Sequence, residues 1–198
     1  MKTLFKALVL TATLALVTIP AQAAIKVYTA VLNGASEAPP VVSAGTGFTI
    51  VTVDDVLNTM RVQVTFTGLT GTTTVAHIHA PTAVAFTGTV GVASYPGTFP
   101  GFPAGVTSGT YDSGAIDMSL TSSFTPAFLT LGGGTAPGAF VLLQSSFAGG
   151  RAYLNVHSTF APGGEIRGFL VAAPEPTPFV LMGLGGVAGL ALRRRRRA

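Results

Sequence analysis

Residues 59–69 read TMRVQVTFTGL, and apolar side chains alternate with polar ones along this stretch until Gly68. Successive side chains of an extended strand point to opposite faces, so this spacing gives one strand an apolar face and a polar face. Other stretches show the same alternation, and Gly, Pro, Asn or Asp lies between most of them. They are residues 25–32, 47–53, 74–80, 88–94, 151–158 and 165–171. The pattern predicts an all-β domain, a single antiparallel β-sandwich of two sheets.

Composition agrees with many short strands and tight turns, because 48% of the residues are hydrophobic and the chain holds 25 glycines and 13 prolines. An amphipathic-helix period is missing from the middle of the chain. Two regions depart from the strand pattern. Residues 95–114 hold three prolines and five glycines and predict a long surface loop. The Thr125-Pro126 pair suits the start of a helix, which predicts a short helix near 125–131 with Thr125 as its cap.

The formal charge of +4 is concentrated at the two ends of the chain. Residues 24–172 contain four basic and six acidic side chains, a difference of −2, so the sequence predicts no nucleic-acid partner. The acids at 54–55, 112 and 117 lie in turn-like settings and are interpreted as turn residues rather than catalytic or calcium-binding groups. No cysteine is present, which excludes disulfides, thiolate metal sites and cysteine nucleophiles.

Residues 1–23 have the layout of a secretory signal peptide. A short basic start precedes an apolar run from 7 to 19, and Pro20 follows it. Ala21 and Ala23 then form the A-x-A pattern that signal peptidase accepts. The apolar run is shorter than the roughly 20 residues of a spanning helix. We expect cleavage after Ala23, which leaves a domain over residues 24–172.

The other end, residues 173–198, joins three features in a fixed order. Pro174, Glu175 and Pro176 come first, and an apolar segment at 179–192 follows. A basic tail then comprises Arg193, Arg194, Arg195, Arg196 and Arg197. The apolar segment predicts a helical membrane anchor, and the arginines would hold the tail in the cytoplasm.

This arrangement resembles the PEP-CTERM sorting signal of exported bacterial proteins. The resemblance implies recognition by an exosortase-type protease, a transient membrane anchor, and delivery to the cell surface or extracellular matrix. A plain C-terminal anchor is the alternative.

The body resembles the CHRD domain, named for the chordin repeats. The similarity runs over residues 25–171 and rests on five motifs: LNGASEAPP at 32–40, GTG at 45–47, FTGL at 66–69, AHIHAP at 76–81 and RAYLNVHSTFAPGGEIRGFL at 151–170. The family implies an immunoglobulin-like or superoxide-dismutase-like β-sandwich and a mostly non-enzymatic role.

The chain has three histidines, His77, His79 and His157. His77 and His79 stand two residues apart on a predicted strand, so both side chains project from one face about 7 Å apart. His157 would complete a mononuclear zinc or copper site if its strand lies nearby. Alternatively, the imidazoles hydrogen-bond to backbone or to Glu165 and join two sheets. Glu165 and Arg167 are the predicted neighbours of the cluster in either case.

Two functions remain open at this point. The first is a non-enzymatic binding or structural module of the bacterial surface, with an extracellular polymer or protein as its partner. The second is a mononuclear zinc or copper module, with weak redox or hydrolytic activity. Carbohydrate binding through aromatic residues of the 95–114 loop is a third idea, resting on these four residues: Tyr95, Phe99, Phe102 and Tyr111.

Overall fold

The computed structural model describes residues 25–174. Six strands come first in this part of the chain, two consecutive helices follow, and three strands come last. The long early strands are β1 (Ile25–Asn33), β2 (Thr46–Asp54) and β3 (Thr59–Thr67). The remaining elements follow in chain order: β4 (Thr73–His79), β5 (Gly109–Asp112), β6 (Ile116–Asp117), α1 (Pro126–Leu131), α2 (Ala136–Ala148), β7 (Tyr153–Ser158), β8 (Ile166–Phe169) and β9 (Val171–Ala172). Short 3-10 turns occupy Gly34–Ser36 and Thr121–Ser123.

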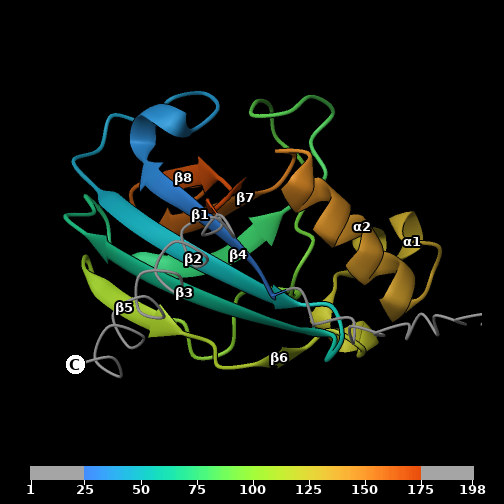
Figure 1. The fold of residues 1–198 in the computed structure, drawn as a ribbon. Helices are drawn as coiled ribbons and strands as arrows, with labels where there is room; N and C mark the ends of the chain where they lie inside the picture. The colour runs from blue at the N-terminus through green and yellow to red at the C-terminus, as the bar shows by residue number, and fades with distance from the viewer. Residues whose placement is uncertain (1–24, 175–198) are drawn as a thin grey trace, which may run out of the picture.

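The strands form one strongly curled antiparallel sheet, a half-barrel rather than the expected sandwich (Figure 1). The strand order is β4-β7-β8-β1-β2-β3-β5, with β6 on β3 and β9 on β1. β1 explains why the prediction of two separate sheets is wrong. It pairs with β2 along its whole length on one edge and with β8 and β9 on the other edge. The strands on both sides of β1 therefore belong to one hydrogen-bonded sheet.

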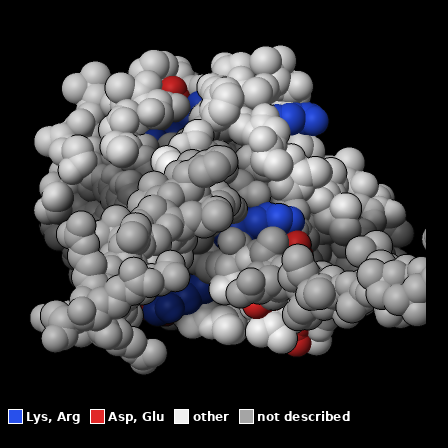
Figure 2. Space-filling view, in the orientation of Figure 1, with Lys and Arg blue, Asp and Glu red and all other residues white. Residues whose placement is uncertain are grey.

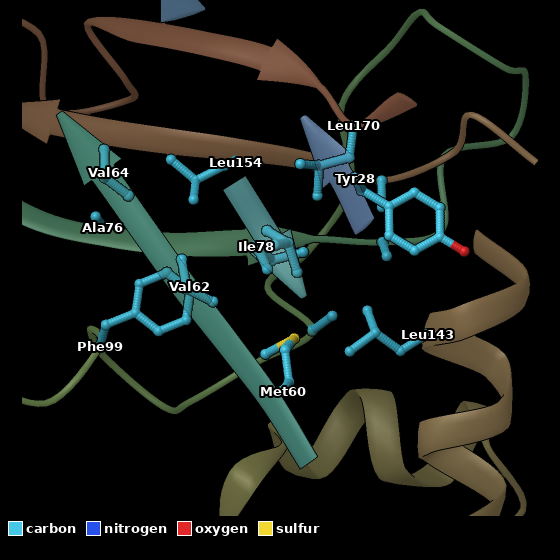
Figure 3. Close-up of a cluster of buried hydrophobic side chains, with 14 of the residues drawn as sticks. Tyr28, Met60, Val62, Val64, Ala76, Ile78, Phe99, Leu143, Leu154 and Leu170 are labelled. Carbon is cyan, nitrogen blue, oxygen red and sulfur yellow. The ribbon is translucent and has the colours of Figure 1, made fainter. Parts of the chain in front are cut away.

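The core lies inside the curl, and the alternation of β3 is confirmed. Met60 and Val62 are fully buried, and Val64 is almost so, whereas Arg61 faces out. Figure 3 shows these side chains around the same space as Ile78 of β4 and other core residues. The apolar face of β3 therefore packs inward, as the period of two requires.

The two helices lie together at one end of the half-barrel (Figure 1). The predicted short helix with Thr125 as its cap is confirmed. Helix α1 begins after Thr125, whose hydroxyl accepts a hydrogen bond of 3.3 Å from the Phe128 amide. The second was not predicted, so the domain is mostly β rather than all-β. Its buried positions do follow a helical period: Ala136, Ala139, Phe140, Leu143 and Phe147. Gly138 and two serines in the same stretch obscured that pattern.

Two further predictions need correction. Residues 88–94 form no strand and make only single bridges, at Val92 with His79 and at Ser94 with Phe124. The predicted 95–114 loop ends in strand β5, which pairs with β3. Its aromatic residues are core rather than a carbohydrate surface, because Phe99 is fully buried and Tyr95 packs against the core. The physical reason is that apolar rings flanked by glycine turns can fold inward and close the open side of the curl.

The charges of the described residues are mostly paired. Lys26 lies 3.0 Å from Asp55, and Arg61 pairs with Asp112. The face in Figure 2 carries scattered charges rather than a continuous basic patch. The acids sit in turns and pairs as interpreted: the Asp54 carboxylate, for example, accepts the amide of Val56 at 2.9 Å.

The predicted signals fall almost wholly outside the described residues. This applies to residues 1–23, with Ala21 and Ala23, and to the chain from Glu175 onward, including the apolar segment and the arginines. Pro174 is the last described residue and is exposed. Between residues 25 and 174, no helix has the length and apolar character needed to cross a membrane.

Candidate metal centre

Strand β7 is buried on both faces, and this property creates the candidate site. Leu154 and Val156 belong to the apolar core. Tyr153, Asn155 and His157, which alternate with these two, point the opposite way, into a second, polar layer. We call this the histidine layer; it consists of His77 and His79 from β4, Tyr153, Asn155 and His157 from β7, and Arg167 from β8.

The strand register brings the layer together. His77 pairs with Asn155, which pairs in turn with Arg167, so three neighbouring strands contribute one row of side chains. His79 lies opposite Tyr153. The sequence alone could not show whether the strand of His157 lies beside His77 and His79. The pairing of β4 with β7 shows that it does.

The three imidazoles lie close together. The ring centroid of His77 is 4.6 Å from that of His79 and 4.6 Å from that of His157. Each ring offers one nitrogen to a group whose members all lie within 4.8 Å of one another. Three nitrogens around one ion, each bonded at about 2.0–2.1 Å, would lie about 3.5 Å apart, so small side-chain movements would close the site.

Each imidazole is oriented by a backbone carbonyl. Nδ1 lies 3.2 Å from the Gly97 oxygen in His77, 2.7 Å from Val90 in His79, and 2.8 Å from Pro162 in His157. A carbonyl only accepts hydrogen bonds, so each Nδ1 carries the proton and each Nε2 keeps a free lone pair. Nε2 of His79 and of His157 are buried without any partner. A carbonyl on the distal nitrogen is how proteins orient metal-binding histidines.

The rings are neutral at physiological pH. Burial lowers the pKa of His77 to about 3, and the neighbouring His79 and His157 lower it further. Burial also lowers the pKa of His79, to about 4, and that of His157. Neutral imidazoles are the form that binds metal, so the layer is in a ligand-competent state without any proton release.

The loops that cover the layer come from distant parts of the chain. Residues 88–97 supply the carbonyls of Val90 and Gly97, together with the Gly88 oxygen, which accepts a hydrogen bond of 3.1 Å from Arg167. The turn after β7 supplies Pro162. These covers explain why the three histidines are only 6–8% exposed although they face away from the apolar core.

Of the two predicted neighbours of the cluster, Arg167 and Glu165, only the first lies beside the histidines. Arg167 lies in the layer, with its guanidinium 4.6 Å from the centre of the Tyr153 ring. Tyr153 in turn stacks on His79 with ring centroids 4.7 Å apart. Glu165, however, contacts none of the histidines. Glu165 lies in the bend just before β8, which begins at Ile166, and its carboxylate accepts hydrogen bonds from Ser158 and the loop at residues 70–71 instead.

Sequence reasoning missed three members of this environment. Tyr153 and Asn155 precede His157 at spacings of two, so the motif YLNVH itself held the signal. Glu37 has no such signal, because it comes from the distant turn after β1 and lies 3.6 Å from Arg167. Oδ1 of Asn155 and Oε1 of Glu37 are buried and lack a hydrogen-bond partner.

The residues present fit a transition-metal ion. The donor set is three neutral imidazoles with free Nε2 atoms, two of them orphaned in the protein interior. Buried polar atoms without a partner are rare in native proteins, and an ion would satisfy these two. Imidazole nitrogens suit zinc and copper rather than calcium or magnesium.

Comparison with protein-family models gives two matches. The model described as CHRD domain matches residues 28–170, and the PEP-CTERM protein-sorting motif matches residues 172–196. None of the curated proteins or solved structures compared with the chain is significantly similar to it. The sorting motif implies processing by an exosortase and export to the cell surface. Because the first match covers most of the sequence, the chain belongs to the CHRD domain family and carries a C-terminal PEP-CTERM sorting motif.

Proposed function

We propose that this protein is a non-enzymatic module of the bacterial cell surface or extracellular matrix that binds one zinc or copper ion through His77, His79 and His157. The observation that carries the proposal is the pair of buried Nε2 atoms, on His79 and His157, that no protein group satisfies. Leaving such atoms unpaired costs about 1–3 kcal/mol each, which a bound ion would recover.

A purely structural role for the histidines is the competing explanation. Each ring does hydrogen-bond to backbone, and these bonds join β4 and β7 to the covering loops. That role uses Nδ1 alone, however, and leaves the buried Nε2 atoms of His79 and His157 without a partner. Metal binding accounts for both nitrogens of every ring.

The non-enzymatic part of the proposal rests on the other members of the histidine layer. Tyr153 is stacked between His79 and Arg167, and Arg167 is held by carbonyls and Glu37. These groups support the rings and are not arranged as a nucleophile and base. We expect the ion to stabilise the fold or to be stored, and an extracellular polymer or protein to be the partner of the domain.

Metal content tests the proposal directly. The full-length chain, purified in detergent, would be incubated with zinc or copper, passed through a desalting column and analysed for metal. We expect one ion per chain, and a rise in melting temperature that a chelator reverses. His157→Gln should abolish retention, whereas Ser146→Ala, a buried change in α2, should not. A wild-type chain that retains no ion would leave the histidines with the structural role alone.

Export and processing need a separate test. Cells producing the chain would be fractionated, and the mature protein weighed by mass spectrometry. We expect a surface-associated form that starts at Ala24 and lacks the arginine block. An intact C-terminus at Ala198 in the surface fraction would contradict removal of the tail.

A further inference from the structure

The charges around the histidine layer are unusual for a site that holds a divalent ion. The described residues place no carboxylate among the three imidazoles, and the group of close metal-type ligands contains histidine alone. Glu165 is occupied by its own hydrogen bonds outside the layer. Any positive charge brought to the site therefore meets no negative ligand.

A buried positive charge stands beside the site instead. Arg167 is 3% exposed, and its guanidinium lies 4.6 Å from the Tyr153 ring, whose other neighbour is His79 at 4.7 Å. Glu37 is the counter-charge of Arg167, at 3.6 Å, and burial raises the pKa of this carboxyl to about 7. At neutral pH, Glu37 thus compensates Arg167 only in part.

We propose that this site takes a monovalent cuprous ion in preference to a divalent ion, and that the buried charge of Arg167 sets the preference. The inference rests on the proposed function and names the ion that the same three histidines hold. The desolvation cost of an ion grows with the square of its charge, so a dication pays about four times as much as a monocation in a buried, anion-free site. Repulsion by Arg167 grows with the charge as well.

The ligand number favours the same ion. Zinc sites in proteins are almost always four-coordinate, and a site with three protein ligands needs a water or substrate in the fourth position. Here the carbonyl-bearing loops bury the rings and leave two of the three Nε2 atoms without solvent contact. Three neutral nitrogens can complete the coordination shell of a low-coordinate cuprous ion. For Zn(II), the same three nitrogens would leave the fourth position empty and would neutralise none of the charge of the ion.

Competition experiments at pH 7, where Glu37 compensates Arg167 only in part, would test the preference. Cu(I), supplied with ascorbate under nitrogen and buffered by bicinchoninate, gives one dissociation constant, and Zn(II) and Cu(II) with their own chelators give the others. The wild-type chain should bind Cu(I) at least tenfold more tightly than Zn(II). Binding of Zn(II) with equal or greater affinity would overturn the inference but leave the proposed function intact. A chain that binds none of the three ions would overturn both.

Charge variants then separate electrostatics from structure, with the Cu(II)/Cu(I) potential as the measurement. Arg167→Gln should lower the potential, each tenfold change in the ratio of the two affinities being 59 mV for one electron. Glu37→Gln removes the counter-charge and should raise the potential, an opposite sign that mere loosening of the fold would not produce. Arg167→Lys keeps the charge and should stay near wild type. Potentials that do not move in these variants would remove Arg167 from the mechanism.

Discussion

The hydroxyl of Ser43 donates a hydrogen bond of 2.6 Å to the carboxylate of Glu165, 122 positions later in the chain. Glu165 is fully buried, and the amides of Thr70 and Gly71 and the hydroxyl of Ser158 donate to it as well. One carboxylate thus joins the segment before β2, the loop before β4 and the end of β7. Its role is to hold the strand ends that frame the histidine layer.

We predict that Glu165→Gln lowers the free energy of unfolding by about 2–4 kcal/mol. The neutral amide loses the charge-assisted hydrogen bonds, and its NH2 group, which only donates, would face N–H and O–H groups that also donate. Urea unfolding at pH 7 measures the loss. Asp117→Asn, an exposed turn acid that accepts the Ser119 amide, is the control and should cost under about 1 kcal/mol. A loss for Glu165→Gln no larger than that of the control would contradict the assigned role.

The same carboxylate gives a pH dependence. Burial would raise the pKa of Glu165, but the hydrogen bonds from Ser158, Ser43, Thr70 and Gly71 outweigh it and hold the pKa below its ordinary value of 4.5. A lowered carboxyl pKa means that the unfolded chain binds more protons. The contribution is therefore complete above pH 4.5 and is lost as the pH falls further. The stability difference between wild type and Glu165→Gln should shrink over that range.

The histidines give a second pH dependence, at higher pH. The pKa of His79 falls from 6.5 to about 4 on folding, so the metal-free fold loses stability as the pH drops below 6.5. We predict that His79→Gln gains about 1.3 kcal/mol relative to wild type between pH 7.5 and 5.5. Denaturant unfolding of both metal-free chains measures this difference. Glu37, with its raised pKa, contributes in the opposite direction, but equally in both chains, so it cancels. A difference that is constant with pH would contradict burial of a neutral His79.

Gly164 covers the histidine layer at close range. A Cβ placed there would lie 2.3 Å from Nδ2 of Asn155 and 2.7 Å from Oε1 of Glu37, and its φ of +128° disfavours any side chain. We predict that Gly164→Ala lowers the free energy of unfolding by about 2–4 kcal/mol and weakens metal binding. Gly163→Ala is the matched control, since nothing lies within 4 Å of its Cβ position. Equal thermal stability of the two variants would show that the loop can move away.

The cap of α1 gives a smaller effect. Thr125 accepts the Phe128 amide and donates a bond of 2.6 Å to the Val92 carbonyl, which ties the helix to the segment beside His79. Thr125→Ala should cost about 1–2 kcal/mol by thermal unfolding. Thr130→Ala, an exposed position on the same helix, should be nearly neutral. The prediction fails if both variants unfold at the same temperature.

Local pattern determined much of this protein from the sequence alone. Alternation of period two located β1, β2, β3, β4 and β7, because an extended strand with one buried face must alternate. Thr125-Pro126 located the start of α1, and the motifs around His77 and His157 identified the family and named the three histidines. Each of these signals depends on residues close together in the chain.

Tertiary structure alone decided the rest, because it depends on which strands pair. The sheet is one curled half-barrel since β1 pairs on both edges, and no alternation pattern specifies a partner. The register of β4 on β7 places His157 beside His77, and a one-residue slip would send it into the core. Arg167 lies in the layer and Glu165 does not, although they stand two residues apart, because β8 begins only at Ile166 and Glu165 lies in the bend before it. The sequence alone thus identified the three histidines as candidate ligands. The pairing of strands that are distant in the sequence brought their imidazoles together into one site.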